Sequence, residues 1–433
     1  MSQDCQYDVA IVGAGPAGLS AARTVARLGF SAILFEQLAQ PGDLQHPCSA
    51  LITPVPGFIG ARRLLDGLFL PSLDLLIPSS LILGFLPAQK FVSPGGYEWR
   101  ATFGPQHDFP AAVLDKAGLL RLMARQARSA GAELRGGAKV TGLLKQDERV
   151  VGVRLGEREV RTSLVICAEG ADRLLSREAG LCEPDMPGQH VVLINQEMVA
   201  PGVRAEHVGQ ILTAGRRYTT APRAFGMLLL PAPGRASIFF TIYVDARRPL
   251  SDRFGQFYVD EYVRTDARVR DVLRGAWVVS RAQRSIELQN APEHVVAHGF
   301  MGAGDTITPA GHLGILPSIY VGRQAAFVAA EALDSGDLSP RGLAAYDTML
   351  HESILPNLET EAQAMLGMAR LGDEEIDRLC QSLSAMNVSK PVFSNWRTLA
   401  WDVIGPLVRE FPLLLHDWHR LQQTSQGASE AGA

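Results

Sequence analysis

The stretch YDVAIVGAGPAGLSAARTVARLGFSAILFE, residues 7–36, decides the fold. Its first six residues form a β-branched, apolar run typical of a buried parallel strand. A glycine-rich turn, GAGPAG, follows and opens a helical pattern that Gly29 ends. A second apolar run, SAILFE, ends on Glu36. Strand, helix and strand within roughly thirty residues predict a βαβ unit.

The glycines of this turn have the spacing GxGxxG, and each has its own physical role. Gly13 permits the tight turn, Gly15 lets the backbone approach a pyrophosphate, and Gly18 allows the helix to pack closely on the strand. Glu36 is placed to accept ribose hydroxyls, and its charge would repel a 2′-phosphate. The pattern predicts a dinucleotide, FAD or NAD rather than NADP. A glycine turn without a ligand is the alternative.

The composition describes an ordinary folded protein. The chain has 433 residues, 47% of them hydrophobic and 20% charged, with a formal net charge of −4, which excludes a disordered chain and allows two or three domains. No Lys/Arg-rich run occurs, so we expect no nucleic-acid partner. Five scattered cysteines without a CxxC pair indicate a reducing compartment and no metal site. The N-terminus lacks a signal-peptide pattern, so we expect a cytoplasmic protein.

The chain divides into a discontinuous nucleotide-binding domain, an inserted substrate domain, a helical region and a disordered tail. Alternating strands between Pro, Gly and Arg turns characterise the inserted part. The expected fold class is α/β: a doubly wound, Rossmann-like domain with an inserted antiparallel β-sheet and a C-terminal helical segment. We assign the nucleotide-binding domain to residues 1–185 and 293–335 (with 50–110 contributing to the substrate pocket), the substrate domain to 186–292, the helical region to 336–422 and the tail to 423–433.

Residues 64–86, LLDGLFLPSLDLLIPSSLILGFL, are long and apolar enough to raise the question of a membrane span. Asp66 and Asp74 carry charge, and Pro71 and Pro78 would each interrupt the backbone hydrogen bonds that lipid requires. We therefore expect no transmembrane span but an irregular apolar excursion, either one wall of an apolar pocket or a patch touching the membrane surface. A loop packed on the core is the alternative.

Two later segments favour FAD over NAD. The run GAGD at residues 302–305 resembles the motif of flavoproteins in which an Asp, here Asp305, holds the ribityl chain. Residues 309–315, PAGHLGI, resemble the PxxGxGI segment that follows it. A helix beginning near Ile315 would aim its positive end at the flavin N1/O2 region. Glu169 and Gly170, with Ser176 and Arg177 after them, resemble the DG motif of the same proteins with Glu in place of Asp. A helix cap and a surface acid are the alternatives for Asp305 and Glu169.

Together these motifs resemble the two-domain flavoproteins that include aromatic hydroxylases, flavin halogenases and geranylgeranyl reductases. The reductases look closest over residues 7–335, since the segments PCSA (47–50), FVSPGG (91–96) and VLDK (113–116) resemble reductase segments near the flavin. Departures are Ser49-Ala50 for a glycine pair and Lys116 for an arginine that contacts the cofactor. The sequence GMLLLP (226–231) keeps only the proline of the reductase motif YxWxFP, so the aromatic platform of an isoprenoid tunnel is replaced by leucine.

Cys48 is the leading candidate for a catalytic residue, because it falls on the cysteine position of the reductase group. A thiol beside the flavin could shape the substrate site, donate a proton after hydride transfer or form a transient adduct. Its neighbour His46 is a candidate proton partner, and His312 could reach the pyrimidine edge of the flavin. The alternatives are a space-filling cysteine and structural or solvent-exposed histidines.

The resemblance implies an FAD-dependent oxidoreductase that transfers a hydride between flavin N5 and a C=C bond of a small apolar substrate, free or bound to a carrier or protein. NAD(P)H would be a transient electron donor, since no second Rossmann fingerprint occurs. A flavin monooxygenase is the first alternative, and a non-catalytic lipid- or prenyl-binding escort protein is the second. We expect the cofactor to contact Gly13, Ala14, Gly15, Pro16, Ala17, Gly18, Glu36, Gln37, Cys48, Ser49, Lys116, Val140, Glu169, Gly170, Gly304, Asp305, Pro309, Gly311, His312, Gly314 and Ile315.

Overall fold

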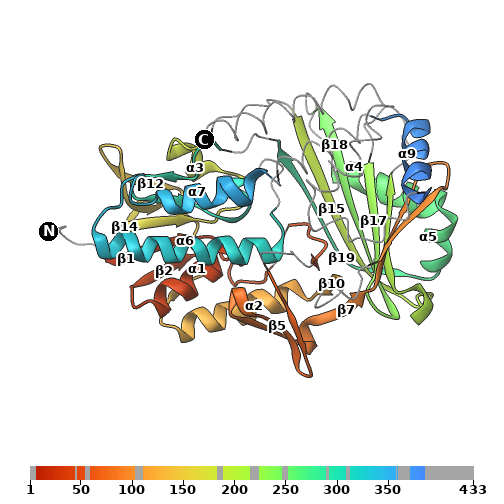
Figure 1. Cartoon of the computed structure of the whole chain (residues 1–433), viewed down its shortest axis with the longest axis horizontal. Helices are drawn as coiled ribbons and strands as arrows, with labels where there is room; N and C mark the ends of the chain where they lie inside the picture. Colours follow the sequence, from red (N-terminus) through yellow and green to blue (C-terminus); the bar gives the residue numbers. More distant parts are fainter. Residues whose placement is uncertain are drawn as a thin grey trace.

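The computed structural model has the nucleotide-binding part at one end and a large antiparallel sheet at the other (Figure 1). The helices within residues 252–272 lie on the outer side of the large sheet, whereas the helices of the nucleotide-binding part run alongside its strands. The structure describes residues 6–43, 46–53, 59–102, 111–182, 189–214, 224–245, 252–288, 292–308, 313–356, 358 and 371–385.

The nucleotide-binding part is built on a sheet with the order β11-β2-β1-β14-β13-β12. Its central strands β1 (Tyr7–Val12), β2 (Ala32–Phe35) and β14 (Arg158–Cys167) run parallel, and β21 (Phe300–Gly302) pairs parallel with β14. All four residues of β2 are buried, because both faces of a parallel sheet are covered. The predicted βαβ start and the Rossmann-like fold class are confirmed. The remaining strands are β11 (Glu133–Arg135), β12 (Gly142–Gln146), β13 (Arg149–Leu155) and β20 (Val296–Ala297), which pairs with β21.

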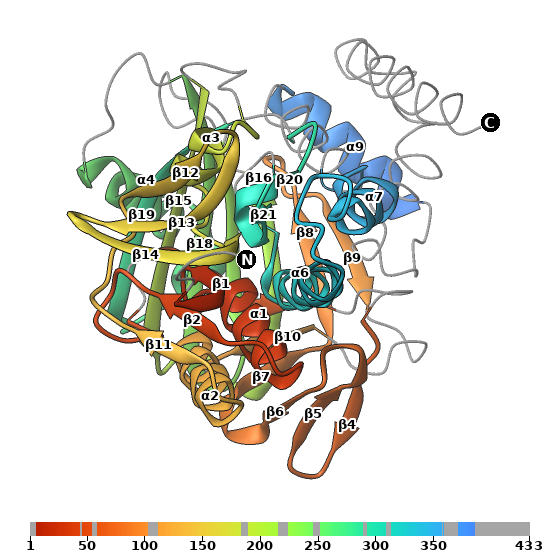
Figure 2. The ribbon, with the colours of Figure 1, turned by 90° about the vertical axis from the view of Figure 1, so that its left-hand side faces the viewer.

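Alternate residues of β1 serve two cores. Val9 and Ile11 pack against the helices α1 (Pro16–Arg27), α2 (Lys116–Ser129) and α6 (Ile315–Ser335). Ala10 and Val12 pack against the antiparallel strands β12 to β14 on the other face. Figure 2 shows α1 and α6 side by side next to β1. Their contact is very close, because a Cβ on Gly322 of α6 would lie 2.1 Å from the Ala17 carbonyl oxygen of α1.

The second part is a seven-stranded sheet with the order β19-β15-β18-β17-β16-β8-β9. One face packs against α4 (Asp252–Thr265) and α5 (Ala267–Val272), through an apolar cluster that includes Phe240, Tyr258 and Tyr262. The sequence pattern predicted four of these strands, β15, β17, β18 and β19, but not these two helices. The strands are β8 (Ala88–Val92), β9 (Glu98–Thr102), β15 (Gln189–Ala200), β16 (Gly209–Ala214), β17 (Ala224–Leu230), β18 (Gly234–Asp245) and β19 (Trp277–Glu287).

The apolar stretch 64–86 is regular, so the expectation of an irregular excursion was wrong. It forms most of a three-stranded antiparallel sheet of β4 (Arg62–Leu64), β5 (Gly67–Leu70) and β6 (Leu75–Pro78), followed by β7 (Ile82–Leu86). Leucines and an isoleucine of β5 and β6 are buried in the main core, because the sheet packs one face on the body of the protein. No helix within the described ranges is both long and apolar enough to cross a membrane.

Short elements link the two parts. Strand β10 (Ala111–Leu114) pairs with β3 (Leu51–Ile52) and β7 in a small antiparallel sheet. Helices α7 (Ala344–Ser353) and α9 (Asp373–Ala385) follow α6, and α9 docks on the loop before β9, where Gly95 N–H donates to Asp377 Oδ1 at 2.7 Å. The other predicted C-terminal helices and the tail lie outside the described residues.

We expect Gly322→Ala to destabilise the protein by about 1–3 kcal/mol, because the added Cβ would meet backbone of α1 and push the two helices apart. Helix propensity alone predicts the opposite sign, a gain of about 1 kcal/mol for Gly to Ala inside a helix. The urea midpoint of unfolding measures the effect. Glu331→Ala, on the exposed side of α6, is the control, and a higher midpoint for Gly322→Ala would contradict the role of this contact.

Candidate FAD site and substrate-facing sheet

Three of the predicted segments converge at the carboxyl ends of the parallel strands. Ala168 N–H, at the end of β14, donates to the Val12 carbonyl at 2.8 Å, and Ala303 N–H donates to the Cys167 carbonyl at 2.8 Å. Thr306 Oγ1 donates to the Gly170 carbonyl at 3.1 Å. Hydrogen bonds therefore join the loops after β1, β14 and β21 at a single edge of the sheet. Ligands of open α/β sheets bind at this edge.

The first glycine turn has the geometry that a pyrophosphate needs. Gly13 has φ +94°, and a Cβ there would lie 2.3 Å from the Ala168 carbonyl oxygen. A Cβ on Gly18 would lie 1.9 Å from the Gly13 carbonyl oxygen, whereas Gly15 has no other atom within 4 Å of its Cβ position. No side chain caps α1 and no acid occupies its first turn. The turn thus leaves free backbone N–H groups beside an open approach, which fits an anion.

Glu36 is held in place at this edge, directly after β2. Its carboxylate accepts the N–H of Ala14 at 2.7 Å and the N–H of Leu38 at 2.8 Å. Each oxygen keeps a further lone pair that can accept a ribose hydroxyl. Gln37 is exposed beside it, and Val140 is half-buried after β11, whose loop donates from Ala138 N–H to the Glu36 carbonyl at 2.8 Å.

The second glycine loop lies against the first turn of α1. Gly304 has φ +70°, and a Cβ there would lie 3.0 Å from the Ala17 Cβ. Asp305 Oδ1 accepts Leu313 N–H at 2.8 Å, which ties the loop to the start of α6. Gly314, with φ +89°, precedes Ile315, and no side chain caps α6. The predicted contacts Pro309, Gly311 and His312 lie outside the described residues.

Glu169 has a local structural task. Its carboxylate accepts the N–H groups of Leu175 and Ser176 at 3.0 and 3.1 Å, so it caps α3 (Leu174–Glu178). Burial raises the pKa of Glu169, although these hydrogen bonds act in the opposite direction. The side chain is directed to α3, which leaves Gly170 as the residue of this motif that contacts the second glycine loop. A contact of Glu169 with the cofactor stays a prediction.

Arg173 is a residue that the sequence analysis missed. It is 2% exposed and has a left-handed backbone conformation, with φ +52°. Burial lowers the pKa of Arg173, and Cys182 and Asp305 lie close enough to act on it in the opposite direction. A buried guanidinium near Asp305 adds positive charge beside the expected path of the cofactor. The sequence holds no signal for it, because Arg173 looks like any charged residue of a polar loop.

Residues 46–52, which we call the Cys48 segment, lie between the nucleotide-binding part and the large sheet, since Cys48 packs on the main core and Ala50 packs with Leu229. Cys48 is half-buried, and its Sγ accepts Ala50 N–H at 3.4 Å. Ala50 has φ +52°, a conformation that favours glycine, so the alanine that replaces a glycine of the reductase segment has a strained backbone. The segment is held by Leu114 N–H, which donates to the Ala50 carbonyl at 3.0 Å.

His46 and Lys116 form a pair at the start of this segment. Lys116 Nζ lies 3.0 Å from His46 Nε2, and Lys116 is 9% exposed at the start of α2. Burial, together with the positive charges of Lys116 and Arg284, lowers the pKa of His46 to about 3. His46 is therefore neutral near pH 7 and accepts at Nε2 from the ammonium, which places its ring proton on Nδ1.

The face of the large sheet opposite α4 is turned toward the Cys48 segment. Leu229 of β17 packs with Ala50, Leu86 and Val113 in one apolar cluster. Register places the neighbours on this face: Met227 pairs with Phe239, and Phe239 pairs with Asn195. Phe225 and Tyr243 make an edge-to-face contact on the same face, with ring centres 6.4 Å apart. Aromatic side chains are therefore present, although β17 lacks the expected motif.

Two ion pairs join this sheet to the nucleotide-binding part. Arg284 of β19 pairs with Asp172, and Arg177 pairs with Glu287 at 3.3 Å. Both partners on the nucleotide-binding side lie in or next to α3. The edge strand β19 is thus fastened to the loop that follows Gly170. Within the described part of the chain, no group of three or more His, Cys, Asp or Glu side chains could hold a metal ion.

The fold and the site are those of an FAD-binding oxidoreductase. The profile of the FAD dependent oxidoreductase family matches residues 98–315, about half of the chain, and that of an NAD(P)-binding Rossmann-like domain matches residues 11–44. The chain belongs to the FAD dependent oxidoreductase family, and FAD is its cofactor.

Relatives of similar length carry reductase names. The chain is 27% identical over 406 residues to the digeranylgeranylglycerophospholipid reductase of Haloferax volcanii, covering 87% of this chain and 89% of the relative. It is 26% identical over 419 residues to the enzyme of that name from Methanosarcina acetivorans, covering 92% and 95%. These similarities extend over nearly the whole of each chain.

Solved structures share the fold. A geranylgeranyl bacteriochlorophyll reductase-like protein from Thermoplasma acidophilum superimposes with a TM-score of 0.77 at 20% identity, covering 96% of this chain and 99% of that chain. A halogenase in complex with phloroglucinol and FAD gives a TM-score of 0.65 at 14% identity, covering 98% and 96%. At these identities the similarity shows the fold alone.

We expect Glu36→Gln to weaken FAD binding by about tenfold or more, because a charge-assisted acceptor is lost and one of the two N–H donors loses its partner. Titration of the apoprotein with FAD, followed by flavin fluorescence, measures the change. Glu133→Gln is the matched control, since this acid sits at the exposed edge strand β11 of the same sheet. Equal affinities of the two variants would contradict the assignment.

We expect His46 to stay neutral down to about pH 3, while the unfolded chain protonates this residue below about pH 6.5. Its contribution to stability therefore falls as the pH drops from about 6.5 toward 3. In Lys116→Met the pKa of His46 should rise, because one positive charge is removed, but stay below 6.5 because burial remains.

Nuclear magnetic resonance titration of the histidine ring measures this pKa, with the signal assigned by its loss in His46→Gln. Arg125→Met, which removes a charge from the exposed face of the same helix, is the control and should leave the pKa unchanged. A normal titration of His46 near pH 6.5 in the unmodified protein would show that the pair with Lys116 does not form.

Proposed function

We propose that this chain is a reductase that saturates a C=C bond of an isoprenoid lipid. The observation that carries the proposal is the apolar face of the large sheet, with Met227, Leu229 and Phe239, turned toward the Cys48 segment. Such a face binds an apolar chain and offers little to a charged or sugar-like substrate. The names of the relatives, which cover most of both chains, support the same substrate class.

The residues of the chain would position the substrate and supply a proton. FAD, when reduced and bound, supplies the hydride from N5 to one carbon of the double bond, and the other carbon takes a proton. Cys48 and His46 are the predicted catalytic residues. Cys48 is proposed either to donate this proton or to contact the substrate and orient its double bond. His46 cannot act as an imidazolium acid near pH 7, because its pKa is about 3. Its role would be to accept from Lys116 and to present Nδ1–H toward the site.

The finer features of the reaction are part of the same proposal. NAD(P)H would serve as a transient donor that reduces FAD, the predicted cofactor contacts would hold FAD along the three converging loops, and the lipid would be reached at a membrane surface from the cytoplasm. The divided nucleotide-binding domain, residues 1–185 and 293–335, and the substrate domain, residues 186–292, would then each contribute one wall of the site.

Anaerobic turnover tests the proposed function. The FAD-loaded protein is incubated with NADH or NADPH and a detergent-soluble geranylgeranyl lipid without oxygen, and the product is analysed by mass spectrometry. A reductase adds two hydrogens per double bond under these conditions. Product that forms only in air, with oxygen consumed in equal amount, would instead assign a monooxygenase.

Cys48→Ser provides the variant for this experiment. We expect FAD to stay bound and turnover to fall by about tenfold or more, because a hydroxyl is a far weaker acid than a thiol. Cys380→Ser is the matched control, since Cys380 lies in α9 and donates to the Tyr97 carbonyl. Unchanged turnover in Cys48→Ser would reduce Cys48 to a packing role.

A further inference from the structure

The sheet of β4, β5 and β6 projects from the lower edge of the molecule in Figure 1, and the turn between β4 and β5 forms its end. We define residues 62–66, with sequence RRLLD, as the tip. All five residues are exposed. Leu65 is fully exposed and Leu64 is 46% exposed. Two adjacent leucines at the end of a projection therefore leave apolar surface in contact with water, which is costly.

The base of this sheet is firmly attached, in contrast to its tip. Leu68, Leu70 and Ile77 are completely buried in the main core. Arg23 of α1 binds both the carbonyl and the carboxylate of Asp74 at 2.8 Å, next to β6. The tip is therefore presented on a rigid support, and its leucines are not the outcome of a loose loop.

Positive charge gathers next to the projection. Helices α1 and α2 contain no Asp or Glu. Arg121, Arg125 and Arg128 follow one another at helical spacing on the exposed face of α2. Arg125 and Arg128 have no ion pair with any residue that the structure describes. The chain as a whole has a net charge of −4, so this basic face does not simply follow from the composition.

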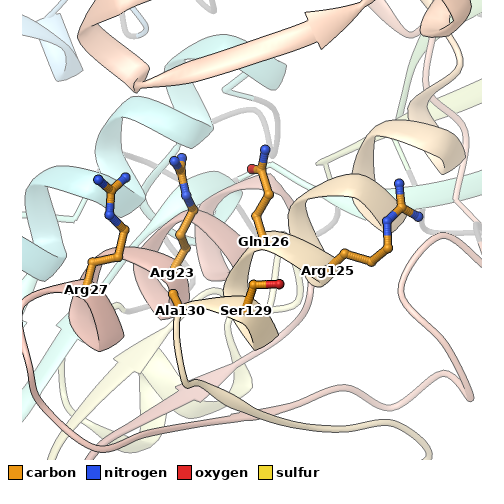
Figure 3. A pocket seen from close by; sticks show the side chains of 6 residues that line it. All are labelled: Arg23, Arg27, Arg125, Gln126, Ser129 and Ala130. Atoms are coloured by element: carbon orange, nitrogen blue, oxygen red, sulfur yellow. The ribbon is translucent and has the colours of Figure 1, made fainter.

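A hollow of about 400 Å³ lies between α1 and α2 on this basic side, lined by Arg23, Arg27, Arg125, Gln126, Ser129 and Ala130. Figure 3 shows the side chains of Arg23, Arg27, Gln126 and Arg125 extending in the same direction from the two helices. Arg27 also binds Asp74, so the hollow adjoins the base of the projecting sheet. Guanidinium groups on a shared side offer paired donors to phosphate oxygens.

We propose that the tip and the arginine face of α1 and α2 dock this protein onto the surface of an anionic phospholipid bilayer. Leu64 and Leu65 enter the interface, and Arg62, with the α2 arginines, lies at the level of the lipid phosphates. An apolar insertion combined with a basic surface is the pairing that gives stable peripheral binding. The inference rests on the proposed function only in one respect, namely that docking would bring the lipid substrate within reach. Binding to the bilayer does not depend on the proposed function.

Vesicle sedimentation tests the docking with the FAD-loaded, full-length protein. The probes are vesicles of phosphatidylcholine alone and of phosphatidylcholine mixed with phosphatidylglycerol. We expect binding to the mixed vesicles and much weaker binding to phosphatidylcholine alone. The double variant Leu64→Ser with Leu65→Ser should bind at least about tenfold more weakly, whereas Val279→Ser, at an exposed apolar position of β19, should bind as the unmodified protein does.

A second pair of variants tests the charge. Arg125→Glu with Arg128→Glu should weaken binding to the mixed vesicles by about fivefold or more for each arginine and make it less sensitive to salt. Arg274→Glu, in the exposed turn between α5 and β19, is the control and should leave binding unchanged. Turnover of the detergent-soluble substrate should be the same in the tip variant and the unmodified protein.

Three results would overturn the proposal: no binding of the unmodified protein to mixed vesicles, equal binding to both kinds of vesicle, or full binding by the tip variant. A change of oligomeric state in the tip variant, seen by sedimentation velocity, would instead assign the tip to contact with a second copy. Failure of turnover with intact vesicle binding would count against the proposed function and leave the docking surface standing.

Discussion

The site depends on backbone segments that approach each other so closely that no side chain fits between them. A Cβ on Gly13 or Gly18 would lie 2.3 or 1.9 Å from a backbone carbonyl oxygen. A Cβ on Gly322 would lie 2.1 Å from the carbonyl oxygen of Ala17. These three contacts hold β14, the first turn of α1 and α6 together. The loops after β1, β14 and β21 can therefore meet at one edge, and the uncapped starts of α1 and α6 lie beside it.

The composition of the large-sheet face opposite α4 depends on how its strands pair, rather than on the motif of any single strand. The segment GMLLLP of β17 lacks the aromatic residues of the reductase motif YxWxFP, although Phe225 precedes it in the same strand. Pairing brings Phe239 of β18 beside Met227, and Tyr243 edge-on to Phe225, on the face turned toward Ala50. An aromatic surface can thus be kept when the residues move to a neighbouring strand, because cross-strand neighbours share one face.

Features that depend on local conformation could be predicted from the sequence. The turn around Gly13, the acid at Glu36 and the loop at Asp305 each require particular residues at fixed spacing, so their patterns carried the information. Features that depend on distant residues could not. Burial of Arg173 and the pair of His46 with Lys116, seventy positions apart, follow from how the parts pack. Glu169 shows the limit of motif reasoning, since its carboxylate caps α3.

The projecting sheet and the Cys48 segment belong to one structural unit, so the proposed docking surface is connected to the proposed site. Strand β7 follows the projection directly and pairs with β10, whose last residue donates to the Ala50 carbonyl. Gly84 of β7 lies so close to Pro231 that a Cβ would meet its carbonyl oxygen at 1.7 Å. The unit therefore contacts the large sheet, the Cys48 segment and the start of α2. A lipid entering beside the projection would meet the apolar cluster around Leu86 and Leu229 before reaching Cys48.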